Sequence, residues 1–236
     1  IKVIKPNDRD QKTTNGVSIF LAGSIEMGKA EDWQKTLTSE LKSLGKGLTV
    51  FNPRRDDWDS SWEQKQSNVQ FNHQVSWELN KLEECDVIFM CGLSMGGGTT
   101  LHVTQKHQSR IRGIILVNPM IHLPLVSVPL AWGVSRIVKM RKAVAGDIKR
   151  PGISEWGYDA TPLVGIHELL KMLKITRQKL GEITLPVQLF HSVDDHTLPV
   201  SNTEIVMKGI SSTNKNRIEL TNSYHVATLD YDADLI

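Results

Sequence analysis

Cysteine, proline and net charge are scarce in this sequence, and glycine is not enriched. Its 236 residues include 2 Cys, 9 Pro and 17 Gly, which excludes a disulfide-rich scaffold and a collagen-like repeat. The 28 Lys and Arg residues nearly balance the 26 Asp and Glu residues, so no basic surface for nucleic acid is expected. With 39% apolar residues the chain has too much hydrophobic material to remain disordered. We therefore expect a folded protein.

Long uninterrupted apolar runs are also missing. The longest apolar stretch, residues 114–134, contains Asn118, His122 and several prolines, which a membrane-spanning helix does not readily tolerate. We expect no signal peptide before it. The cysteines, Cys85 and Cys91, lie around an apolar run, where small hydrophobic residues are common. We expect a chain without a membrane span, in a reducing, cytoplasmic setting.

The apolar residues that are present fall into short runs separated by helical patterns. The runs predict buried strands, and the stretches between them carry apolar residues three or four positions apart, as amphipathic helices do. Strands that are apolar throughout indicate a mostly parallel sheet with helices on both faces. The expected fold class is therefore α/β, a three-layer αβα sandwich. The expected strands are residues 17–22, 48–51, 86–90, 114–117, 187–190 and 217–220.

The same alternation suggests how the chain is organised. Residues 1–16 are polar and unpatterned, which predicts an N-terminal arm. Residues 17–236 are expected to form a single α/β domain. Within that domain, residues from about 119 to 183 are more than a crossover between two strands needs, so we expect an inserted cap there.

The sharpest motif is Gly92-Leu93-Ser94-Met95-Gly96, between a predicted strand and a predicted helix. In a G-x-S-x-G motif the glycines permit a tight turn that lifts the serine hydroxyl above the sheet. The N–H of Met95 would then point at a developing oxyanion, next to the positive end of a helix. The pattern also fits a tight turn whose serine has no role, or a glycine loop that binds phosphate.

An activated serine needs a base and an acid, and later strands supply candidates. Residues 191–196, which include Asp194 and Asp195, follow one predicted strand, and residues 221–225, which end in His225, follow the next. Open α/β sheets place their sites at such strand ends. The chain order of serine, acid and histidine is that of α/β-hydrolases.

Three motifs carry a family resemblance: GLSMGG (92–97), HSVDDHTLP (191–199) and NSYHVATLD (222–230). On these motifs the chain from about residue 86 onward resembles an α/β-hydrolase of the monoacylglycerol lipase and carboxylesterase type. The resemblance implies hydrolysis of a small carboxylic ester beneath the cap, without a cofactor or metal ion. It also implies Asp195 as the acid, with Asp194 as the second choice.

Residues 17–90 resemble a different family, on the motifs IFLAGSIEMGKAEDWQ (19–34), VFNPRRDDWD (50–59) and FNHQVSWELNKLEECDVI (71–88). They are similar to nucleoside 2-deoxyribosyltransferases. This implies a flavodoxin-like half that binds a nucleoside at the loop after the first strand, with Gly23 and Ile25 as substrate-binding residues. Where that family has its catalytic glutamate, this chain has GLSMGGGTTLHV, without a carboxylate, and Glu78 lies on the preceding helix. Transferase chemistry is therefore expected to be absent.

The sequence thus predicts a chimera, with a flavodoxin-like first half (17–90) joined to an α/β-hydrolase second half (91–236) between about residues 79 and 91. The usual hydrolase signature for the second oxyanion donor is missing, and we expect the N–H of Ser24, or else Gly23, in its place. The first hypothesis is a serine ester hydrolase weakened by this substituted loop, with the triad Ser94, Asp195 and His225. The alternatives are a nucleoside-binding or deoxyribosyl-transferring protein, and a folded chimera without activity. The oligomeric state stays open.

Overall fold

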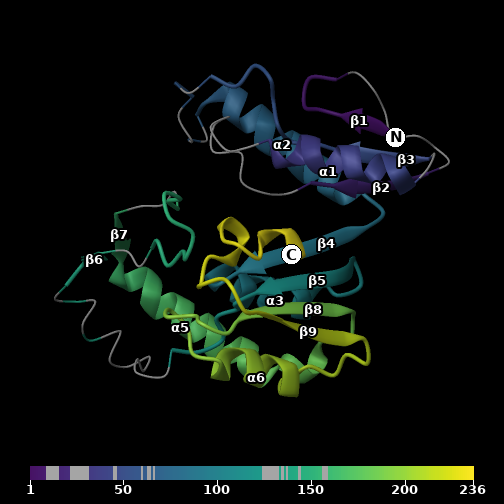
Figure 1. Cartoon of the computed structure of the whole chain (residues 1–236). Helices are drawn as coiled ribbons and strands as arrows, with labels where there is room; N and C mark the ends of the chain where they lie inside the picture. Colours follow the sequence, from purple (N-terminus) through teal and green to yellow (C-terminus); the bar gives the residue numbers. More distant parts are fainter. Residues whose placement is uncertain are drawn as a thin grey trace. The chain divides into compact units, whose positions relative to one another are not determined.

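The structure is a computed structural model in which the chain forms two compact units, Ile1–Ile88 and Phe89–Ile236 (Figure 1). Each unit is described by itself. The single continuous domain expected from the sequence stays a prediction. The residues described are 1–8, 16–21, 32–44, 47–59, 61–62, 65, 67–123, 133, 136, 138–142, 145–155 and 159–236.

The first unit contains a three-stranded parallel sheet in the order β1-β3-β2. Its helices begin at side-chain caps: Asp32 accepts a hydrogen bond from the N–H of Lys35, and Asn68 accepts one from the N–H of Phe71. The elements are β1 (Lys2–Ile4), β2 (Val17–Phe20), α1 (Trp33–Leu41), η2 (Lys42–Leu44), β3 (Leu48–Phe51) and α2 (Val69–Glu84).

The expected N-terminal arm is wrong for its first residues. Lys2–Ile4 pairs with β3, and the side chain of Ile4 is fully buried in a cluster with Phe51 and Cys85. A run of three residues is too short to show the period of a strand, and its hydrogen bonds come from a partner more than forty positions away.

The second unit contains a four-stranded sheet in the order β4-β5-β8-β9, in which β5, β8 and β9 run parallel. This alternation of strands and helices confirms the predicted α/β fold class. Its main elements are β4 (Ile88–Leu93), α3 (Met95–His107), β5 (Ile111–Val117), α5 (Leu163–Gln178), β8 (Val187–Ser192), α6 (Ser201–Gly209) and β9 (Lys215–Leu220).

The described residues of the expected cap form two different structures. A short antiparallel pair, β6 (Met140–Lys142) and β7 (Ala160–Pro162), lies within it. Helix α5 instead packs against α3, where the carbonyl of Thr176 accepts one hydrogen bond from Gln105 Nε2 and its hydroxyl lies 2.9 Å from His102 Nδ1. The last part of the predicted cap is therefore a helix of the sandwich itself, and its buried face explains the apolar spacing read from the sequence. Short turns η3 (Leu180–Glu182), η4 (Ala227–Leu229) and η5 (Ala233–Leu235) complete the unit.

Candidate active site

Ser94 lies at the tight turn between β4 and α3, as the motif predicts. Its backbone has φ 54° and ψ −120°, a conformation that residues other than glycine seldom adopt. Its N–H donates to the carbonyl of Val117 at 3.0 Å, and its carbonyl accepts from the N–H groups of Gly97 (3.0 Å) and Met120 (2.8 Å). The strain is therefore held by backbone bonds on both sides of the residue, as in a nucleophile elbow.

Two glycines of the motif are required by close packing. A Cβ on Gly92 would collide with the carbonyl oxygen of Gly96, and one on Gly97 would lie 2.7 Å from the Cβ of Pro119. A side chain at either of these two positions would therefore clash, whereas a Cβ on Gly96 would meet nothing within 4 Å. Met95 is the first residue of α3, so its N–H has no acceptor within that helix and is available to an anion.

His225 and Asp195 meet in a buried hydrogen bond. His225 Nδ1 lies 2.8 Å from Asp195 Oδ2, and the two side chains are only 8% and 2% exposed. The other oxygen of Asp195 accepts from the N–H groups of Thr197 and Leu198, each at 2.8 Å. The neighbouring Asp194 is 53% exposed and lies 3.8 Å from the ammonium of Lys149. Of the two candidate acids, Asp195 is therefore the one in contact with the histidine.

This arrangement prepares the imidazole to act as a base. A carboxylate can only accept a hydrogen bond, so Nδ1 of His225 carries the proton and Nε2 keeps a free lone pair. The two N–H donors on the far oxygen hold the carboxylate plane in place, which fixes the direction of the ring.

The carboxyl ends of all four strands of this sheet meet at one edge. The N–H of Ser94 binds the end of β5 at Val117, and the N–H of Asn118 donates to the carbonyl of Phe190 in β8. The N–H of Val193 donates in turn to Leu220, the last residue of β9. The turn that holds Ser94 and the loops that hold Asp195 and His225 therefore leave the sheet at the same edge, where α/β folds place their sites.

Three polar residues that the sequence analysis missed surround the loop of His225. Asp147 accepts from the N–H of His225 at 3.2 Å, and Asn118 donates to the carbonyl of His225 at 2.8 Å. Asp230 is 1% exposed and accepts from the N–H groups of Lys149, Arg150, Tyr224 and Tyr231. Of these three residues, only Asn118 could have been suspected from the sequence, because it is a polar residue directly after the predicted strand 114–117.

Burial and hydrogen bonding act in opposite directions on these carboxylates. Burial on its own would raise the pKa of Asp147, but hydrogen bonds from His196 and from the N–H groups of His225 and His196 lower it below its ordinary value. Burial likewise opposes the backbone hydrogen bonds that lower the pKa of Asp230. Both side chains therefore stay ionised at neutral pH and accept hydrogen bonds from the loops that they join.

The expected second oxyanion donor, Ser24, lies outside the described residues, and so do Gly23 and Ile25. Those assignments stay predictions. Among the residues that are described, no group of three or more His, Cys, Asp or Glu side chains is placed to hold a metal ion. None of the described helices is long and apolar enough to cross a membrane.

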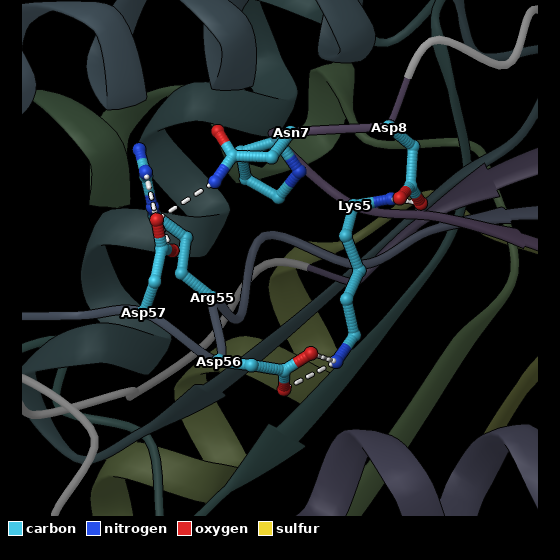
Figure 2. A pocket seen from close by; sticks show the side chains of 7 residues that line it. Lys5, Asn7, Asp8, Arg55, Asp56 and Asp57 are labelled. Atoms are coloured by element: carbon cyan, nitrogen blue, oxygen red, sulfur yellow. Dashed lines mark hydrogen bonds and ion pairs between the residues drawn. The ribbon is translucent and has the colours of Figure 1, made fainter.

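The first unit has a small surface pocket of about 220 Å³. Figure 2 shows that its charged side chains pair with one another: Lys5 with Asp56 at 2.6 Å, and Arg55 with Asp57 at 2.8 Å. The hydrogen bonds from Arg55 lower the pKa of Asp57 to about 2. The two cations that line the pocket are already neutralised, so it offers little attraction to an anionic ligand. The lining residues are Lys5, Pro6, Asn7, Asp8, Arg55, Asp56 and Asp57.

Two family models match the chain. One described as "Nucleoside 2-deoxyribosyltransferase like" matches residues 16–93, and one described as "Serine aminopeptidase, S33" matches residues 71–232. Both resemblances read from the sequence are confirmed, and the matches are consistent with a chimera. The two matches overlap over residues 71–93, which include the predicted join at about 79–91.

The proteins to which the chain is similar include lipases. A curated relative, the thermostable monoacylglycerol lipase of Bacillus sp. strain H-257, is 37% identical over 154 residues, which are 65% of this chain. The chain spans 61% of the length of that relative. A solved structure from work on LipS and LipT, two metagenome-derived lipolytic enzymes, has a TM-score of 0.66 at 29% identity, over 93% of this chain and 89% of that one.

The fold is shared more widely. A soluble variant of monoglyceride lipase from Saccharomyces cerevisiae, in complex with a substrate analog, has a TM-score of 0.57 at 19% identity. The match covers 94% of this chain and 84% of that one. At this identity the likeness shows the fold alone.

Proposed function

Since the chain belongs to the family described as serine aminopeptidase, S33, we propose that it is a serine hydrolase of the esterase and lipase type. The observation that carries the proposal is the buried hydrogen bond between Asp195 and His225, at the sheet edge where the strained turn of Ser94 lies. The curated relative is a monoacylglycerol lipase, which supports a glycerol ester of a single fatty acid as the substrate class.

The proposed roles follow the chemistry of acyl transfer. Ser94 Oγ attacks the ester carbonyl while Nε2 of His225 takes the hydroxyl proton, and the N–H of Met95 stabilises the oxyanion. The alcohol leaves with the proton from His225, and Ser94 remains acylated. Water then attacks the acyl-enzyme, again giving its proton to His225, and the acid is released as Ser94 Oγ recovers its proton. Asp195 holds the imidazole in the required tautomer throughout.

The second oxyanion donor determines how fast this reaction is. The sequence predicts the N–H of Ser24 for that role, and this residue lies outside the described part of the chain. Losing one such donor costs about 3 kcal/mol of transition-state stabilisation, which is roughly a hundredfold in rate. If the second oxyanion donor is poorly placed, we expect a low kcat although Ser94 itself remains reactive.

The test uses a fluorophosphonate probe and a p-nitrophenyl ester of a short fatty acid. We expect the probe to add to the peptide that contains Ser94, and Ser94→Ala to abolish both labelling and hydrolysis. Ser211→Ala, which changes an exposed serine of the same unit, is the matched control and should keep both. Hydrolysis that survives Ser94→Ala would refute the assignment. A cooperatively folded protein that does not react with the probe would support the inactive chimera.

A second candidate function is nucleoside binding, which the family match over residues 16–93 favours. Burial raises the pKa of Glu78 in α2, and this carboxylate accepts a hydrogen bond from Gln74 at 2.6 Å. This candidate predicts saturable binding of a deoxynucleoside by calorimetry, unaffected by Ser94→Ala. If calorimetry detects no heat of binding at millimolar nucleoside, this candidate function is rejected.

A further inference from the structure

Asn118 has an unusual backbone conformation for a buried residue. It follows the last residue of β5 with φ 42°, and only 2% of it is exposed. Asparagine tolerates the left-handed region better than most residues, but the conformation still costs free energy. Such a conformation persists where surrounding contacts hold it, and these residues gather at functional sites.

The amide of Asn118 is held by three hydrogen bonds that fix its orientation. Its Oδ1 accepts from the N–H of Ser192 at 2.7 Å, and its Nδ2 donates to Ser192 Oγ at 2.9 Å and to the carbonyl of His225 at 2.8 Å. Exchanging the oxygen and the nitrogen would set two carbonyl groups against each other, so the network permits one orientation. Ser192 Oγ in turn donates to the carbonyl of Tyr224, next to His225.

Two residues close to Asn118 in the chain, Val117 and Met120, hydrogen-bond to the backbone of Ser94. Val117 accepts from the N–H of Ser94 at 3.0 Å, and Met120 donates to the carbonyl of Ser94 at 2.8 Å. The segment 117–120 therefore binds the backbone of the nucleophile turn through its own backbone, and the backbone of His225 through one side chain.

From these contacts we infer that Asn118 is a positioning residue that sets the separation between Ser94 and His225. The inference rests on the proposed function, since it concerns the proton transfer between those two residues. The side-chain hydrogen bonds of Asn118 go to Ser192 and to the backbone of His225, not to the side chain of Ser94 or the imidazole of His225. Asn118 acts by anchoring the carbonyl of His225 to the strand end that also holds Ser94. A displacement of about 1 Å at a reacting group can cost roughly a hundredfold in rate, so one anchoring bond can govern catalysis.

Two substitutions separate this role from backbone strain. Asn118→Gly relieves the positive φ and removes all three side-chain bonds, while Asn118→Asp keeps the shape and the acceptor for Ser192 but sets an oxygen against the carbonyl of His225. With a p-nitrophenyl ester, we expect each variant to lower kcat roughly a hundredfold. KM should change little, because the amide of Asn118 is buried and engaged by Ser192 and His225. Phosphonylation of Ser94 should slow in parallel with kcat.

The matched control is Asn202→Ala. Asn202 is also 2% exposed, and its Oδ1 accepts from the N–H groups of Ile121 and His122, further along the same segment. We expect it to lower Tm as Asn118→Gly does, but to retain the kcat of the unmodified protein. An equal loss of kcat in both would mean that Asn118 acts through stability alone, and would overturn the inference.

The remaining outcomes distinguish the inference from the proposed function. Unchanged kcat in folded Asn118→Gly and Asn118→Asp, with hydrolysis abolished by Ser94→Ala, would overturn the inference alone. Hydrolysis that survives Ser94→Ala would overturn the proposed function and the inference with it. If neither Asn118 variant folds, Asn118 serves the fold and the positioning role is rejected.

Discussion

At the scale of single residues, the neighbouring carboxylates of Asp194 and Asp195 lie in different environments. Asp195 is buried, with one oxygen on His225 and the other on two backbone N–H groups, whereas Asp194 lies in solvent near Lys149. The sequence preferred Asp195 through a family pattern, and only the fold could show which carboxylate contacts the imidazole. Adjacent positions with one side chain type thus lie in different environments.

Asp195→Asn should therefore lower kcat by roughly 10⁴, because an amide can donate to Nδ1 and favour the wrong imidazole tautomer. Asp194→Asn is the control and should leave kcat at the level of the unmodified protein. Steady-state hydrolysis of one ester by all three proteins is the measurement. Similar losses in the two variants would mean that the carboxylates act together through charge, contrary to the geometry.

The site could be predicted from the sequence only where its residues follow a local rule. Ser94 stands in a motif with a fixed turn geometry, and Asp195 and His225 each follow a strand end. Asp147 and Asp230 hydrogen-bond to partners far along the chain, so no spacing pattern indicates them. Asn118 directly follows a predicted strand, but its contact with His225 could not be predicted from that position. Sequence alone gives the reacting groups, while the side chains that hold them in place emerge from the fold.

At the scale of elements, Asp147 joins two loops of the site. It accepts from Nδ1 of His196, the residue after Asp195, at 2.8 Å and from the N–H of His225 at 3.2 Å. The carbonyl of Asp147 accepts from the N–H of Val226. The short segment around Asp147, within the stretch expected as a cap, therefore fastens the loops after β8 and β9 to each other.

The pair of His196 and Asp147 should make stability depend on pH. The hydrogen bond to Asp147 raises the pKa of His196 above 6.5, so its contribution is complete below that value and is lost as pH rises through the raised pKa. Hydrogen bonding outweighs burial and lowers the pKa of Asp147 below 3.8, so its contribution is present above that value and is lost in stronger acid. The pair is therefore most stabilising between pH 3.8 and 6.5.

We expect His196→Ala to reduce the free energy of unfolding more at about pH 5.5 than at about pH 8.5, as measured by urea denaturation. In an Asp147→Asn background the same substitution should have a smaller effect that varies less with pH, since Asp194 and Asp195 still act on His196. An effect of His196→Ala that is equal at the two pH values would contradict the ion pair.

At the scale of the whole molecule, the positions of several strands along the chain follow from the apolar runs. Residues 48–51 form β3 as predicted, and 114–117 form the second half of β5. The runs could not show that Lys2–Ile4 joins a sheet, or that Met140–Lys142 pairs with Ala160–Pro162, because such short pairings depend on the register of distant strands. The sequence motifs showed that two parts of the chain resemble two different families. The spacing of apolar residues alone would not have shown this.

The bond between Asn118 and His225 connects residues that are 107 positions apart in the chain, and the one between Asp147 and His225 closes a loop of 78. Closing long loops is entropically costly and occurs late, after local helices have formed. During refolding from urea, ester hydrolysis should accordingly return more slowly than the helical circular dichroism signal. If the two signals recovered at the same rate, the sheet edge that carries the proposed site would form together with the helices rather than after them.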